Sequence, residues 1–266
     1  MPHTNTFKKS IVHADQGMVG VQMLFLGTFF MSTAHTHKKL ALGASVYLIW
    51  FALVYLACQK IRPTAHNNET RRALYVVISM LQGVAMMLAT YNTAKAVSLQ
   101  MMSSLWTVAG NICLGAVSGT SLGFYILAMS DMGLVHSAGG SAALIVICAL
   151  LMSVSMAWVP SQSFAMCSAI LGAYLFVLGV DCFAHTGYLS HLSVFTHLGL
   201  NAWYYAEPRA MVLQAVALVL ALVSAAWQRW YALTRFRTIL QTNGFLGLGL
   251  GLGPGLDAGP MRMQNE

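Results

Sequence analysis

The residues best suited to chemistry follow the sixth apolar segment of the chain. Asp181 is followed by His185, His191 and His197, at offsets of four, ten and sixteen residues. Asp181 and His185 share one face if this segment is helical, and they are the only candidates for acid–base work in a membrane enzyme. His191 and His197 follow at steps of six residues, which would place them on other faces of a helix than Asp181 and His185. Zinc needs three or four ligands that converge on one point. We therefore predict no catalytic residues, no metal and no cofactor, and interpret Asp181 as an anchor at a helix end.

The remaining reactive side chains form no recognisable constellation. The five cysteines lie in or beside apolar segments without a C-x-x-C pair, which is typical of small core residues rather than of a disulfide framework. The sequence contains neither G-x-S-x-G nor H-E-x-x-H. A membrane hydrolase would need a nucleophile or a paired acid. The sequence therefore predicts a protein that is not an enzyme.

The composition of the chain predicts that these residues lie on or beside membrane helices. The chain has 266 residues, of which 58% are hydrophobic and only 8% charged, against about 25% charged in an ordinary soluble domain. The 49 residues between Asp131 and Asp181 contain no Asp, Glu, Lys or Arg. One membrane span takes about 20 such residues. Uninterrupted apolar runs are too long for barrel strands, so the fold class is an all-α polytopic bundle without a soluble domain.

Seven spans account for the apolar segments. A polar segment precedes them at residues 1–17, the transmembrane domain covers 18–237, and a Gly/Leu-rich tail, which we expect to be flexible, covers 238–266. No ionisable residue falls near the middle of a span, which argues against a proton pump, a voltage sensor or a retinal protein. The predicted spans are residues 18–34, 40–59, 73–92, 105–129, 138–158, 163–180 and 211–230.

Glycines in two spans predict close helix packing. Gly115, Gly119 and Gly123 lie four residues apart in the fourth span, and Gly172 and Gly179 lie seven apart in the sixth. Glycines with these spacings share a helix face and allow another helix to approach closely. Packing within one bundle and homodimerisation both remain open for the fourth span.

Four amides are the only strongly polar groups deep in the spans. Gln22, Gln82, Asn111 and Gln214 are candidates either for interhelical hydrogen bonds or for the lining of a permeation path. The break at Pro160 between the fifth and sixth spans also suits a transporter, although no internal repeat is evident. Both interpretations of the amides stay open.

Charge does not decide the orientation. In a seven-span chain, seven Lys and Arg lie on the N-terminal side and six or seven on the other. A glycosylation sequon at Asn68 would place the N-terminus outside. The 14 basic residues lie mostly beside span ends, where they meet lipid head groups, so we predict no nucleic-acid binding.

The stretch Ile170-Leu-Gly-Ala-Tyr-Leu-Phe-Val-Leu-Gly-Val-Asp-Cys-Phe183 resembles a family signature. It is similar to the sixth span of the seven-helix domain shared by transmembrane protein 198 and transmembrane 7 superfamily member 3, in which Asp181 and Phe183 match the closing motif. Three further segments resemble that domain: the glycine-spaced 115–129, the turn at Trp158-Val-Pro160 and the closing Trp227-Gln-Arg-Trp230.

The resemblance implies a seven-helix integral membrane protein with its N-terminus outside and its C-terminus in the cytoplasm. Animal members are linked to scaffolding in Wnt receptor signalling, but their long basic tail is replaced here by a short Gly/Leu tail. We expect a non-enzymatic scaffold or assembly component of a membrane signalling or trafficking complex, in contact with the lipid bilayer and with other membrane proteins or itself. The alternative is a small-solute transporter or channel, and plasma membrane and endomembranes both remain open as its location.

Overall fold

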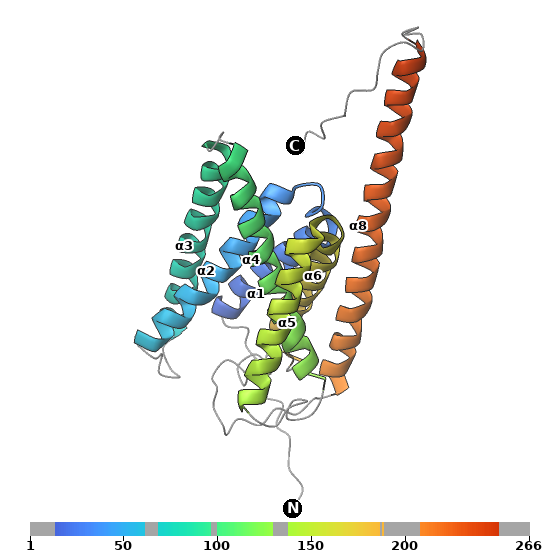
Figure 1. The fold of residues 1–266 in the computed structure, drawn as a ribbon. Coiled ribbons are helices and arrows are strands. Elements are labelled where there is room, and N and C mark those ends of the chain that lie inside the picture. Colours follow the sequence, from blue (N-terminus) through green and yellow to red (C-terminus); the bar gives the residue numbers. More distant parts are fainter. Residues whose placement is uncertain are drawn as a thin grey trace, which may run out of the picture. The chain divides into compact units, whose positions relative to one another are not determined.

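The fold was analysed in a computed structural model, which describes residues 14–61, 69–96, 100–129, 138–186, 188 and 208–249. The chain divides into a unit of residues 1–228 and a second unit of residues 229–266. The described residues contain no strand, which confirms the all-α prediction (Figure 1). Seven long helices are described: α1 (Ala14–Ser32), α2 (Lys38–Ile61), α3 (Glu69–Ala96), α4 (Gln100–Leu127), α5 (Ala138–Trp158), α6 (Pro160–Ala184) and α8 (Pro208–Gly249).

Six of these helices are long and apolar enough to cross a membrane: α2, α3, α4, α5, α6 and α8. The apolar part of α1, Gln16–Ser32, is shorter. A helix needs about 17 to 25 residues to span the hydrocarbon core, so α1 lies at the lower end of that range. Long exposed apolar side chains cover the outer faces, among them Phe25 at 74% and Leu81 at 67% exposure. Such a surface belongs in lipid, so the protein is an integral, multi-pass membrane protein.

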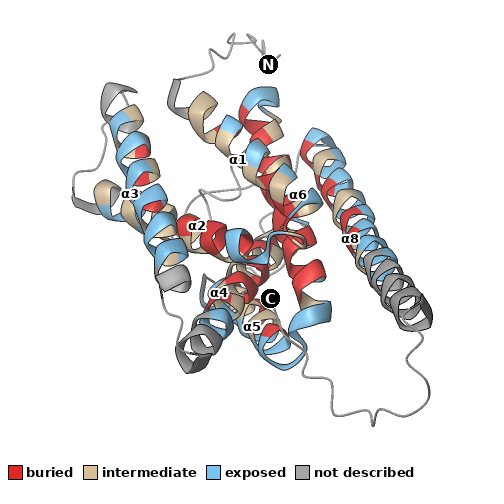
Figure 2. Ribbon diagram, turned by 90° about the horizontal axis from the view of Figure 1, so that it is seen from above, coloured by how far each residue is buried: buried red, intermediate tan, exposed pale blue. Residues whose placement is uncertain are grey.

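Helix α6 forms the centre of the first unit. It packs against α1, α4 and α5, while α2 packs against α3 and α4. Figure 2 shows the buried residues concentrated along α6, whereas α3 is largely exposed. Two apolar clusters fill the interior, one around Phe30, Leu114 and Leu171 and the other around Tyr174, Leu178 and Tyr188.

Several helix ends differ from the predicted span ends. Helix α6 begins at Pro160 rather than at residue 163, because proline fits the first turn of a helix, where its missing N–H leaves no bond unmade. Helix α4 begins at Gln100 rather than at residue 105. Helix α8 continues to Gly249, past residue 237, where the predicted transmembrane domain ends. Hydropathy marks the part of a helix that lies in lipid, whereas backbone hydrogen bonds propagate cooperatively into polar flanks.

Candidate functional site

One of two very close helix contacts joins α1 to α6 through glycines on both helices. A Cβ atom added to Gly172 would lie 2.8 Å from the Met31 nitrogen, and one added to Gly179 would lie 2.8 Å from the Leu24 nitrogen. Both distances are far below van der Waals contact, so the two backbones touch. The sequence analysis identified Gly172 and Gly179 as packing residues, and the structure places both against α1.

The matching glycines on α1 were missed by the sequence analysis. A Cβ atom at Gly27 would lie 2.6 Å from the Phe176 nitrogen, and one at Gly20 would lie 2.8 Å from Cys182 Cβ. Gly20 and Gly27 are seven residues apart, the same spacing as Gly172 and Gly179. A spacing of seven keeps residues on one face of a helix that coils around a partner. The same seven-residue spacing of glycines in the first and sixth spans was the signal from which the α1–α6 contact could have been predicted.

The glycine-spaced face of α4 lies against α5. A Cβ atom at Gly115 would lie 2.7 Å from Ser153 Cα, and one at Gly119 would overlap the Cys148 carbonyl oxygen. Gly123 has more room, because its Cβ would lie 3.0 Å from Ile145 Cα. This face is therefore occupied by a helix of the same chain, and it offers no free surface for homodimerisation.

The first polar cluster surrounds Gln228, which is only 1% exposed. Its Nε2 atom donates to the carbonyl oxygens of Phe30 and Met31, at 2.9 and 3.0 Å. The Ser168 hydroxyl donates to its Oε1 atom at 2.9 Å, and the Ser224 hydroxyl donates to the Met31 oxygen at 2.8 Å. The last carbonyls of a helix have no partner within that helix. Gln228 and Ser224 therefore cap the C-terminal end of α1 from α8.

A second polar contact joins α8 to α4 through Gln214, one of the four predicted amides. Gln214 Nε2 donates to the Tyr125 carbonyl oxygen at 2.9 Å, and the Tyr125 hydroxyl donates to the Gln214 carbonyl oxygen at 3.1 Å. The two residues thus exchange a pair of interhelical hydrogen bonds. Gln214 is 6% exposed, so water is excluded from this contact.

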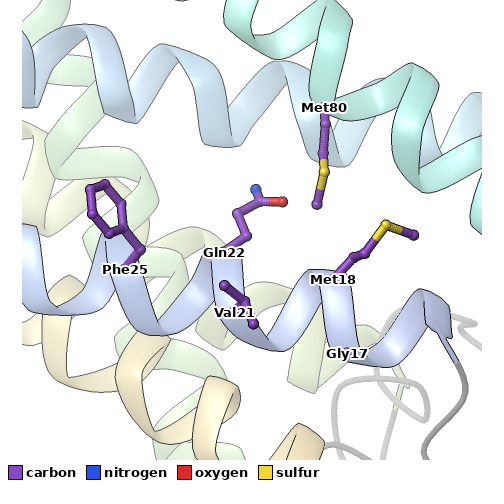
Figure 3. A pocket seen from close by; sticks show the side chains of 6 residues that line it. All are labelled: Gly17, Met18, Val21, Gln22, Phe25 and Met80. Atoms are coloured by element: carbon purple, nitrogen blue, oxygen red, sulfur yellow. The ribbon is translucent and has the colours of Figure 1, made fainter.

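Gln22 borders a hollow of about 550 Å³ between α1 and α3. A side-chain hydrogen bond links Gln22 to Tyr47 of α2. Its Oε1 atom is buried and has no hydrogen-bond partner among the described residues. Figure 3 shows the amide and the Met80 side chain projecting into the space between the two helices. Apart from Gln22 the lining is apolar and comprises Gly17, Met18, Val21, Phe25 and Met80.

The two other predicted amides lie apart from these contacts. Gln82 is exposed on α3, and Asn111 is half-buried on α4. Gln22, Gln82, Asn111 and Gln214 thus lie on four different helices, and of the four only Gln22 lines the hollow between α1 and α3.

Asp181 is buried at 3% exposure in the last turn of α6. Its Oδ1 atom accepts the Thr186 backbone N–H at 2.8 Å and also the Thr186 hydroxyl. His185 ends the helix in the left-handed conformation, with φ of 50°, and its N–H donates to the Asp181 carbonyl oxygen at 2.9 Å. The carboxylate thus holds the turn that terminates α6. The neighbouring Phe183 is exposed on its outer side, and its ring closes over Gly20.

The described residues contain no group of three or more His, Cys, Asp or Glu side chains placed to hold a metal ion. His185 turns its Nδ1 atom to the Phe183 carbonyl oxygen at 3.0 Å. Asn68, His191 and His197 lie outside the described residues.

The family follows from a comparison with known protein families. The model of the TM7S3/TM198-like domain matches residues 20–229, from the first glycine of the α1–α6 contact to the residue after Gln228. The chain belongs to this family, as the sixth-span motif predicted. No curated protein and no solved structure matches the chain.

Proposed function

We propose that the protein is a non-enzymatic assembly component of a membrane complex, with its activity in the contacts it makes rather than in chemistry. The observation that carries this proposal is how its buried polar side chains are used. Gln214, Gln228 and Ser224 all bond to backbone carbonyls of other helices. Asp181 is engaged by Thr186 in a helix-ending turn. A catalytic or transport site would present such groups to a substrate. Here they hold helices together or end a helix.

Glycine contacts support the same proposal. The backbones are in contact at Gly27 between α1 and α6 and at Gly119 between α4 and α5, so no water fits between the helices at these points. A tightly joined bundle suits a protein that holds a fixed surface for partners.

The alternative proposal is a small-solute transporter or channel. It is favoured by Gln22, whose buried oxygen atom lacks a partner among the described residues and borders a hollow. A transport path needs a series of such groups. Asn111 on α4 is a further candidate, because its side chain is only half-buried.

Cysteine labelling distinguishes the two proposals. The five native cysteines are replaced, and single cysteines are introduced at Gln22, Asn111 and Gln214. They are reacted with a membrane-impermeant thiol reagent in permeabilised membranes, so that the reagent reaches both sides. Leu81→Cys is the lipid-facing control, and His37→Cys in the exposed turn before α2 is the water-facing control. An assembly protein leaves all three interior positions unlabelled while His37→Cys reacts. Labelling at two interior positions overturns the assembly proposal in favour of transport.

We further propose that the N-terminus lies outside and the C-terminus in the cytoplasm, as in the animal members of the family. The turn at His37 then faces the cytoplasm and Asn68 faces outward, because α2 separates them. In intact cells the reagent should label Asn68→Cys and spare His37→Cys. The reverse pattern would invert the orientation.

A further inference from the structure

Helix α3 presents two opposite faces. Val76, Ser79 and Gly83 are buried toward the bundle, and the Tyr47 ring of α2 lies against Gly83, at 2.7 Å from the position of an added Cβ atom. The opposite face is exposed along its whole described length (Figure 2). Among the described helices, α3 packs mainly on α2 and, less extensively, on α1.

The exposed face carries a heptad stripe that we call the α3 seam. Its members alternate in steps of four and three residues, and all are exposed: Ile78, Gln82, Ala85, Ala89 and Asn92. Two of these five residues are amides and two are alanines, whereas the flanking Leu81 and Leu88 are ordinary lipid-facing side chains at 67% and 52% exposure. The seam therefore differs in composition from the lipid-facing surface around it.

Gln82 occupies the position where an exposed amide is most costly. The span of α3 is Ala73–Asn92, so Gln82 lies at its middle, in the hydrocarbon centre of a bilayer. An amide without a hydrogen-bond partner in an apolar medium is strongly unfavourable. The Gln82 side chain makes no hydrogen bond to the described residues, and a polar group of another molecule would satisfy it.

Helix α8 shows what such a stripe does in this chain. Its inward positions within the first unit follow the same steps of four and three residues. All are buried except the half-buried Ala221, and they combine small residues with two glutamines: Ala210, Gln214, Ala217, Ala221, Ser224 and Gln228. Both glutamines bond to neighbouring helices. The α3 seam has the same make-up but faces outward.

We propose that the α3 seam is the interface of a homodimer, in which α3 packs against α3 of a second copy. A primary amide both donates and accepts, so Gln82 is complementary to itself across a two-fold axis along the membrane normal. Ala85 and Ala89, four residues apart, allow the two backbones to approach. The heptad spacing sets a left-handed crossing, which keeps all five positions on the contact. This inference deepens the proposed assembly function and rests on it for its biological purpose.

The test uses the full chain reconstituted in phospholipid vesicles at low protein-to-lipid ratio, with the oligomeric state measured by single-molecule photobleaching. The unsubstituted chain should be dimeric. Gln82→Leu should raise the dimer dissociation constant about tenfold, because two reciprocal interhelical hydrogen bonds are lost. Ala85→Leu should raise it further by separating the helices. Ala142→Leu on the exposed face of α5 is the matched control and should change nothing.

Disulfide crosslinking then locates the contact. In the cysteine-free background, Ile78→Cys and Ala85→Cys should crosslink between copies on oxidation, whereas Val84→Cys, exposed but off the seam, should not. A monomeric chain, an unchanged dissociation constant for Gln82→Leu, or equal crosslinking at Val84→Cys would overturn the proposal. Each of these results leaves the interior labelling test untouched, so failure of the dimer and failure of the assembly function are distinguishable.

Discussion

Two interfaces within the first unit join helices by opposite means. Between α1 and α6 the backbones touch, because Gly172 lies against the Gly27 carbonyl oxygen and Gly179 against the Gly20 carbonyl oxygen. Helix α8 makes no comparably close backbone approach to the other described helices. It is held instead by the side chains of Gln214, Ser224 and Gln228.

The two interfaces should differ in how well they tolerate substitutions. A backbone contact leaves no room to adjust, so any added atom has to push two helices apart. An amide contact loses only its hydrogen bonds when the side chain is replaced, and in membranes such bonds contribute modestly, about 0.6 kcal/mol on average. The glycine interface should therefore be the sensitive one and the α8 interface the adaptable one.

The largest effect is expected from Gly27→Val. The added side chain would meet the Phe176 backbone nitrogen, which belongs to a helix and cannot move alone. Overpacking of this kind costs about 3 kcal/mol. The measurement is the free energy of unfolding in mixed micelles. Gly139→Val is the matched control, because nothing lies within 4 Å of an added Cβ at Gly139, and a loss of stability there equal to that of Gly27→Val would refute the argument.

A graded effect is expected along the α4–α5 contact. Gly119→Ala should cost about 2 kcal/mol, because its Cβ would overlap the Cys148 carbonyl oxygen, whereas Gly123→Ala should cost about 1 kcal/mol or less. Thermal unfolding in detergent can rank the two variants. Equal melting temperatures would show that α5 shifts freely, and α4–α5 would then belong with the adaptable interfaces.

The membrane class and the packing glycines of α4 and α6 could be predicted because length, hydropathy and spacing are local properties. The helix that packs on each glycine face could not be predicted, because the spacing of Gly115, Gly119 and Gly123 does not identify α5 as their partner. In the sequence, Gln228 was noted only as part of the closing motif Trp227-Gln-Arg-Trp230. Its hydrogen bond to the Phe30 carbonyl oxygen depends on tertiary structure and could not be predicted. The exposure of Gln82 could not be predicted either. Apolar residues surround it on every side of the α3 span, so hydropathy alone does not show which face of the helix points outward.

A smaller effect is expected from Gln228→Leu. The variant removes the hydrogen bonds to the Phe30 and Met31 carbonyl oxygens and leaves the Ser168 hydroxyl without Oε1 as its acceptor. The Ser224 hydroxyl still caps the Met31 oxygen, so the expected cost is about 1.5 kcal/mol rather than the sum of all the bonds. Unfolding in mixed micelles measures it, and the double variant with Ser224→Ala should cost more than either change alone. A Gln228→Leu cost as large as that of Gly27→Val would erase the contrast between the two interfaces.

The smallest effects should come from the Gln214–Tyr125 pair, and they test how the α8 contact is built. Each side chain bonds to the backbone of the other residue, so Gln214→Leu and Tyr125→Phe remove different bonds. Each variant should lose about 0.6 kcal/mol, and the double variant should lose the sum. A double-mutant cycle measures the coupling between them. Coupling near zero is expected despite the direct contact, because neither side chain is the other's hydrogen-bond partner. Coupling of about 1 kcal/mol would instead mean that the two bonds form only together, and this α8 contact would then not be adaptable.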